Sequence, residues 1–158
     1  PDVISYSAAI SACGNGQQLR AVFSVLSFMQ HRQVQPNEIT YNAAISACEK
    51  CMQWAEALTF LSEMCQRRLE RDAVGFSAAI SALEKGGLWD EAVRVLRDMQ
   101  RQLVESDSCS HGAAITACAK GERWQDALGI LFDMQQRRMD PGVITYSAAI
   151  SACDKGNR

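Results

Sequence analysis

Residues 36–50, which read PNEITYNAAISACEK, decide the fold of this chain. The start of this stretch returns with few changes, each time 35 residues along the chain, as PDVISYSAAIS (1–11), RDAVGFSAAIS (71–81), SDSCSHGAAIT (106–116) and PGVITYSAAIS (141–151). A fixed period of this length, without insertions, is typical of stacked repeat arrays. The sequence therefore predicts one repeat array over residues 1–158, with units 1–35, 36–70, 71–105, 106–140 and a partial unit 141–158.

Each unit has the pattern of two helices. In the second unit, Tyr41, Ile45 and Cys48 have the i, i+4, i+7 spacing of one helix face. A second apolar stripe with helical spacing runs from Trp54 to Met64, and its tryptophan recurs at Trp89 and Trp124. We expect helices over about 38–49 and 53–67, joined by a short turn. The predicted fold class is all-α, an α-solenoid of helical hairpins.

Residues at the ends of the predicted helices agree with this interpretation. Asn37 precedes the first helix of its unit, where an asparagine side chain caps free N–H groups. Gly86, Gly87 and Gly121 follow first helices, as helix C-terminal signals do. No polar capping helix closes either end of the array, so we expect the end units to fray or to associate end-to-end. Since the fifth unit stops half-way, we also expect this chain to be a piece of a longer array.

Composition narrows the class of partner. The net charge is −2 and the pI is about 5.7, which is weak evidence against nucleic acid but leaves room for a local basic row. No run of 18 apolar residues occurs, so no membrane partner is expected, and the fragment contains no targeting segment. Cys13, Cys48, Cys118 and Cys153 share a repeat position that Leu83 occupies in the third unit, which predicts buried, reduced thiols.

No group of residues points to catalysis. Cys48 and Cys51 form a CxxC, but a zinc site needs four ligands and no second pair follows. His31 and His111 have no counterparts in the other units. We therefore expect no enzyme activity, no cofactor and no metal.

The repeated motif resembles that of a known family. The period of 35, the P-[DN]-x-[IV]-[ST]-Y pattern and the tryptophan at the start of the second helix differ from tetratricopeptide repeats, which have a period of 34 and an early W-x2-L-G-x2-Y. They resemble the pentatricopeptide repeat, in its P-type of 35 residues. The resemblance implies a right-handed superhelix that binds single-stranded RNA, one base per repeat. It also implies organellar RNA processing, stability or translation, in a mitochondrion or plastid.

By this resemblance, two positions per unit select the base and a third packs against it. The implied base-selecting residues are Ser7 with Asn37, Asn42 with Asp72, Ser77 with Asp107, Gly112 with Gly142, and Ser147 without a partner. The implied base-packing residues are Ile4, Ile39, Val74, Cys109 and Ile144. The family's pairing rules imply the RNA site 5′-AUGN-3′, with the first unit at the 5′ end.

Other interpretations compete for the same residues. Lysines recur at the end of each first helix except in unit one, where Asn15 stands; they are Lys50, Lys85, Lys120 and Lys155. The resemblance implies that they contact phosphates, but a lysine there also stabilises the helix dipole. Asn37, Asp72 and Asp107 are equally suited to helix capping. For the whole chain, the alternatives are a peptide-binding scaffold like the tetratricopeptide repeats, or a structural spacer.

Overall fold

The computed structural model describes residues 2–156, and all regular structure in that range is helical. The helices are α1 (Val3–Asn15), α2 (Leu19–His31), α3 (Glu38–Lys50), α4 (Trp54–Gln66), α5 (Ala73–Lys85), α6 (Trp89–Arg101), α7 (Ser108–Lys120), α8 (Trp124–Gln136) and α9 (Val143–Gly156). The two helices expected in the second unit lie within one residue of their predicted ends. The all-α prediction is therefore confirmed, and none of these helices has the length and apolar character needed to cross a bilayer.

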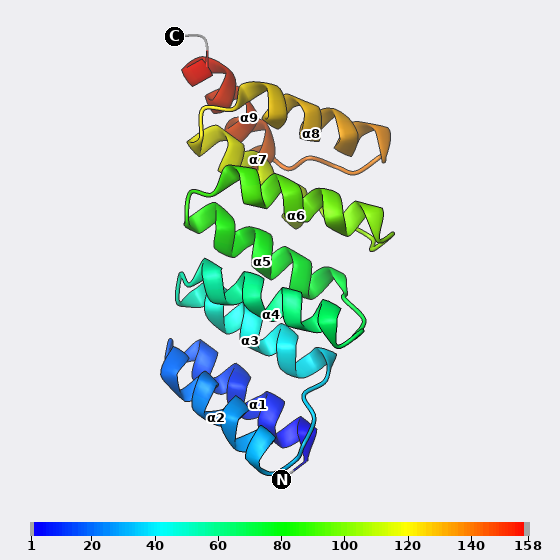
Figure 1. Cartoon of the computed structure of the whole chain (residues 1–158). Helices are drawn as coiled ribbons and strands as arrows, with labels where there is room; N and C mark the ends of the chain where they lie inside the picture. The colour runs from blue at the N-terminus through cyan, green and yellow to red at the C-terminus, as the bar shows by residue number, and fades with distance from the viewer. Residues whose placement is uncertain (1, 157–158) are drawn as a thin grey trace.

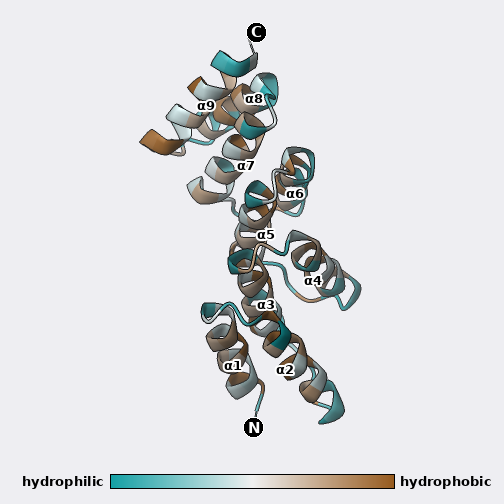
Figure 2. Cartoon of the chain, turned by 90° about the vertical axis from the view of Figure 1, so that its left-hand side faces the viewer, coloured by the Kyte–Doolittle hydropathy of each residue, from teal (hydrophilic) through white to brown (hydrophobic). Residues whose placement is uncertain are grey.

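The helices form an α-solenoid with two rows, stacked from the N-terminus at one end to the C-terminus at the other (Figure 1). Each odd-numbered helix packs against the next odd-numbered helix, and α2, α4, α6 and α8 each pack between two of them. Figure 2 shows the even-numbered helices standing off to one side of the odd-numbered row. Within residues 2–156 no two even-numbered helices come into close backbone contact. The odd-numbered row is therefore the spine of the array.

Small side chains allow the odd-numbered helices to approach closely. The alanines of the repeated AAISA segment lie fully or almost fully buried between these helices, as Ala44, Ala47, Ala79, Ala82, Ala114 and Ala117. Between α1 and α3 even alanine is too large, because a Cβ on Gly14 would lie 2.7 Å from Ala47 Cβ. Since each interface repeats, the core is continuous along the array.

A side-chain cap fixes the start of α1, α3, α5 and α7. The side chains of Asn37, Asp72 and Asp107 accept hydrogen bonds from the backbone N–H of Thr40, Gly75 and Ser110, at 3.1, 3.0 and 2.8 Å. In α3, Thr40 Oγ1 also accepts a hydrogen bond from the Asn37 N–H, which completes a capping box. The capping interpretation of these residues is confirmed.

Two of the three turn glycines, Gly86 and Gly121, have a different role from the one expected, whereas Gly87 has the left-handed backbone of a helix C-terminal glycine. Gly86 and Gly121 end α5 and α7 with φ of −76° and −85°, so their backbone is not left-handed. The left-handed residue is the next one, at Gln17, Met52, Gly87 and Glu122. A non-glycine residue tolerates this position in three of the four turns. The requirement for glycine at the helix end must come from packing.

The side chain that packs against the glycine at the helix end is a tryptophan. Trp54, Trp89 and Trp124 each lie against the glycine that ends the odd-numbered helix of the following unit. A Cβ there would approach the indole Cδ1 to 2.7 Å at Gly86, 2.1 Å at Gly121 and 2.0 Å at Gly156. The prediction that these tryptophans belong to the core stripe is only partly right, because Trp54 and Trp124 remain 38% exposed at the edge of the array.

The first interface lacks this contact. Leu19 occupies the tryptophan position and Cys51 the glycine position. A hollow of about 420 Å³, lined in part by these two residues and by Gln17, Gln18 and Met52, lies there instead. The tryptophan and the glycine therefore go together in the sequence because they fill the same space.

A second contact joins the two helices within a unit. Tyr41 Oη donates to Glu63 at 3.0 Å, and the equivalent pair in unit four is His111 and Asp133, at 3.3 Å. Burial, with the bond to Glu63, raises the pKa of Tyr41 to about 12. Partial burial alone would raise the pKa of Asp133, but hydrogen bonds from Arg137 and His111 outweigh it and hold that pKa below its usual value. His111 is fully buried in the aromatic position of its unit.

The glycine contact can be tested with a pair of alanine variants. In Gly121→Ala, the new Cβ collides with Trp89, whose ring is also held by Arg123, 4.5 Å from its centroid. We expect the free energy of unfolding to fall by about 1–3 kcal/mol, the usual cost of overpacking. In the control Gly129→Ala, a Cβ meets nothing within 4 Å, and helix propensity should raise stability by up to about 1 kcal/mol. Urea midpoints measure both; equal shifts in the same direction would contradict the packing role.

Candidate nucleic-acid interface

Two hollows follow one another along the side of the odd-numbered helices. The first has a volume of about 410 Å³ and includes Ile39, Asn42 and Val74 in its lining. The second has a volume of about 420 Å³ and includes Val74, Ser77 and Cys109. Ser46 and Val74 are shared, and seven of the ten lining residues of the first hollow are replaced in the second by the residue 35 positions later. We call this pair of hollows the odd-helix groove.

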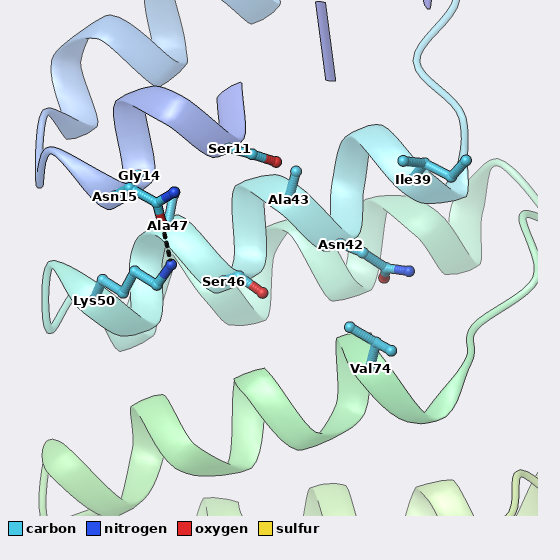
Figure 3. A pocket seen from close by; sticks show the side chains of 10 residues that line it. All are labelled: Ser11, Gly14, Asn15, Ile39, Asn42, Ala43, Ser46, Ala47, Lys50 and Val74. Carbon is cyan, nitrogen blue, oxygen red and sulfur yellow. Dashed lines mark hydrogen bonds between the residues drawn. The ribbon is translucent and has the colours of Figure 1, made fainter. Parts of the chain in front are cut away.

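The predicted base-packing residues project into this groove. Ile39 is 62% exposed and Val74 57% exposed, which is unusual for branched apolar side chains in an otherwise well-packed array. Figure 3 shows Ile39 and Val74 on either side of Asn42. Ile4, Cys109 and Ile144, at the same repeat position, are exposed as well. An exposed apolar side chain therefore lies on either side of Asn42, and Val74 and Cys109 line the hollow that contains Ser77.

In unit two the predicted base-selecting pair is in direct contact. Asn42 Nδ2 donates to both carboxylate oxygens of Asp72, at 3.0 and 2.9 Å. Asn42 is only 9% exposed, and its Oδ1 atom is buried without a hydrogen-bond partner in the described part of the chain. Asn42 is therefore not a solvated residue on the helix surface: it lies at the bottom of the groove, against the next odd-numbered helix.

In units one and three a hydroxyl group of the next helix joins the pair. Ser7 Oγ shares a 2.9 Å hydrogen bond with Thr40 Oγ1, which donates in turn to Asn37 Oδ1 at 2.9 Å. Ser77 Oγ donates to Asp107 Oδ1 at 3.2 Å and also bonds to Ser110 Oγ. Ser7 is buried like Asn42, while Ser77 is half-buried.

The carboxylate of Asp107 is held in its charged form. Desolvation would raise its pKa, but hydrogen bonds from the Ser110 hydroxyl and backbone N–H, and from Ser77, outweigh it and lower the pKa. These bonds all reach Oδ1, and Oδ2 accepts none from residues 2–156. At neutral pH, Asp107 therefore offers a hydrogen-bond acceptor to a ligand and no donor.

Units four and five depart from this arrangement. Gly112 and Gly142 bring no side chain, and a Cβ on Gly142 would meet nothing within 4 Å. Near Gly112 the nearest group is the Thr145 hydroxyl, 3.2 Å from where a Cβ would be. Ser147 lies exposed on α9. Within the described residues, units four and five therefore have no polar pair equivalent to Asn42–Asp72.

The lysine row is partly neutralised. Lys85 Nζ lies 2.9 Å from Glu49 Oε1, and Lys120 forms the equivalent ion pair with Glu84. Lys50 donates instead to the neutral Asn15, the contact drawn as a dashed line in Figure 3. Lys155 is exposed on α9. A phosphate group would therefore compete with a carboxylate at two of the four predicted lysines.

The two hollows between even-numbered helices lie two units apart, and eight of the ten lining residues of the first are replaced in the second by the residue 70 positions later. One, of about 200 Å³, is lined by aromatic rings such as Phe23 and Phe60, whereas the other, of about 260 Å³, is lined by polar residues such as Gln100 and Asp133. Cys48 lies in the core, where burial raises the pKa of its thiol to about 12. The odd-helix groove differs because its two hollows occur in consecutive units and include predicted base-packing and base-selecting residues in their lining.

Sequence reasoning missed five residues at this surface. Thr40, Gly75 and Ser110 touch the base-selecting side chains, and Glu49 and Glu84 pair with the lysines. The two groups each occupy one position of the repeat, so alignment of the units would have marked them. An alignment of the units does not show that these five residues contact side chains of a neighbouring unit.

Comparison with solved structures supports the fold. The chain is similar to the crystal structure of the pentatricopeptide repeat protein PPR10 from maize, with a TM-score of 0.84, 24% identity, and coverage of 100% of this chain and 23% of that one. PPR10 in complex with an 18-nt psaJ RNA element gives 0.82 at 23% identity, covering 97% and 22%. The PPR domain of Arabidopsis thaliana protein-only RNase P 1, in complex with tRNA, gives 0.81 at 13% identity, covering 94% and 81%. The chain thus spans less than a quarter of PPR10.

Family models match almost the whole chain. No curated protein sequence matches it significantly. The model described as the PPR repeat family matches residues 1–50, the pentatricopeptide repeat domain matches 94–156, and the PPR repeat matches 39–69 and 74–102. Together with the 35-residue helical hairpins, these matches show that the chain belongs to the pentatricopeptide repeat family.

Proposed function

We propose that this array binds single-stranded RNA in the odd-helix groove, one nucleotide per repeat, and that it selects 5′-AUGN-3′. The biological role would be organellar RNA processing, stability or translation, in a mitochondrion or plastid, without catalysis by this part of the chain. The observation that carries the proposal is the regular alternation of exposed apolar side chains with polar pairs, Ile39, Asn42–Asp72, Val74, Ser77–Asp107 and Cys109.

Stacking would supply the affinity. A base is a flat apolar plate with polar edges, and its faces suit the slots between Ile39 and Val74 and between Val74 and Cys109. Contacts to base faces contribute on the order of 1–3 kcal/mol per base where the partner is aromatic. Because the side chains that would contact the bases here are aliphatic, we expect a contribution near the lower end of this range. The affinity of the array for a few nucleotides should therefore be modest.

Base edges would supply the selectivity. Uracil and guanine carry an imino N–H, which the carboxylates of Asp72 and Asp107 can accept, whereas adenine presents a lone pair at the same edge. In unit one, Asn37 Oδ1 is occupied by the N–H and hydroxyl of Thr40, which leaves its amide N–H groups to donate to adenine. The outward group is thus a donor in unit one and an acceptor in units two and three, as the proposed order A, U, G requires.

Binding to short RNAs tests the proposal. Fluorescence anisotropy should give higher affinity for an RNA containing AUG than for scrambled versions. Asn42→Ala should reduce discrimination at the second nucleotide about tenfold, the effect of losing one hydrogen-bonded contact to a charged pair. The control Gln125→Ala, on the opposite side of the array, should change nothing. Equal affinity for all RNAs would overturn selective binding, and binding of peptides alone would favour the scaffold alternative.

The ion pairs of the lysine row give a second test. An exposed salt bridge is worth about 0–1 kcal/mol, so removing Glu49 should cost little stability while releasing Lys85. Glu49→Gln should strengthen RNA binding and steepen the slope of log K against log salt by up to about 0.7, the contribution of one phosphate contact in a single strand. Adding Lys85→Gln to the Glu49→Gln variant should flatten the slope again by a similar amount. If Glu49→Gln leaves the slope unchanged, Lys85 does not contact phosphate.

The exposed face of α9 supports the proposed self-association. Ile10, Ile45, Ile80 and Ile115 are fully buried against the following unit, but Ile150 at the same position is 69% exposed. In a second copy, α1 could cover this face. Sedimentation analysis should show mass rising with protein concentration, and Ile150→Lys should suppress the rise. Leu103→Lys, at an exposed loop residue, is the control; a constant mass for the unmodified chain would contradict end-to-end association.

A further inference from the structure

The third residue of each odd-numbered helix lies directly beneath the base-selecting residue of the preceding unit. We call it the N3 residue; it is Ser5 in α1, Thr40 in α3, Gly75 in α5, Ser110 in α7 and Thr145 in α9. The described contacts are Ser7 with Thr40, Asn42 with Gly75, Ser77 with Ser110, and Gly112 with Thr145. Thr40, Ser110 and Thr145 are buried there, whereas Ser5, with no unit before it, is exposed.

The sizes of the paired residues are complementary. Among the base-selecting residues that contact an N3 residue, which are Ser7, Asn42, Ser77 and Gly112, the largest is Asn42. It faces the smallest N3 residue, Gly75, where a Cβ would come within 2.6 Å of Asn42 Oδ1. The smallest, Gly112, faces Thr145. A glycine inside a helix costs roughly 0.5–1 kcal/mol relative to alanine, so its presence at N3 only in the unit after an asparagine needs a local reason. The room required by Asn42 is that reason.

The N3 side chain also decides how the polar pair is bonded. Where it carries a hydroxyl, as in Ser110, it donates to Asp107 Oδ1 at 2.6 Å and bonds to Ser77, so it fixes both members of the pair. Thr40 does the same for Asn37 and Ser7. Where it is Gly75, the amide of Asn42 enters the space and bonds both oxygens of Asp72 directly. The N3 residue therefore sets which lone pairs and protons remain for a ligand.

We propose that the N3 residue is a third specificity-determining position, which acts by positioning the base-selecting pair of the preceding unit. The inference rests on the proposed function, because it concerns selectivity for a nucleotide. It predicts that the selectivity of a unit depends on a residue that belongs to the next repeat and contacts the base-selecting side chain. In this chain, Gly75 is required for Asn42 to pair with Asp72, and Ser110 for the arrangement of Ser77 and Asp107.

A double-mutant cycle on the whole chain tests this. The variants are Gly75→Ser, Asn42→Ser and the two together; the double variant reproduces the chemistry of unit three, with serine, serine and aspartate. Gly75→Ser alone should lower the Tm by roughly 3–10 °C, since the new Cβ overlaps Asn42, and should abolish discrimination at the second nucleotide. The double variant should recover the Tm and prefer guanine at the second nucleotide.

Base preference separates positioning from stability. The discrimination between guanine and uracil at the second nucleotide should exceed the product of the two single effects by about tenfold, while preference at the third nucleotide stays unchanged. Gly129→Ser, in open space on α8, is the control and should alter neither nucleotide. Additive effects on discrimination would overturn the N3 role while leaving RNA selection by the unmodified chain intact. If the unmodified chain shows no base preference, the proposed function fails and the N3 role fails with it.

Discussion

Close contact between odd-numbered helices is the constraint from which the rest of the array follows. Alanines at the interface bring the backbones together, and at Gly14 no side chain at all is tolerated. Because each interface uses the same positions, the spacing between units is constant. A constant spacing is what allows exposed side chains such as Ile39 and Val74 to form equivalent slots. Over the described part of the chain, the even-numbered helices make no close backbone contact with one another, and each stabilises the two odd-numbered helices that it contacts.

The helix caps connect the fold to the proposed function. Asp72 and Asp107 each use one carboxylate oxygen to accept the N–H of an N3 residue, which fixes the side chain at the start of the next helix. The second oxygen is then held toward the groove: in Asp72 it accepts from Asn42 as well, and in Asp107 it is available to a ligand. Capping and base selection are therefore not competing explanations. The cap stabilises the helix and, by removing rotational freedom, preorganises the group that would meet the base.

The sequence alone predicted what depends on the register of the repeat. Helix ends and the burial of Cys48 and Cys118 follow from position within a unit, although Cys13 and Cys153 in the first and last units are only half-buried. The exposure of Ile39 and Val74 agrees with the role that the family resemblance implied. Sequence reasoning failed where a residue acts on a neighbouring unit. The helical spacing placed Trp89 in the apolar stripe of its own unit but did not show that it also packs on Gly121, and nothing in the sequence showed that the next helix buries Asn42. A pattern within one repeat does not show which face the following repeat covers, so contacts between units needed the structure.

The ion pairs beside the groove affect which part of RNA binding would be strong under the proposed function. Glu49 and Glu84 occupy the groove side of the lysine row and neutralise Lys85 and Lys120, so long-range attraction of a phosphate chain is weak. Non-selective binding, which depends on that attraction, is weakened most. Stacking and edge contacts depend on the base and its position, and they keep their full strength. Under the proposed function, such an array would have less affinity for RNA in general, and a larger share of the remaining affinity would depend on the sequence that lies in the groove.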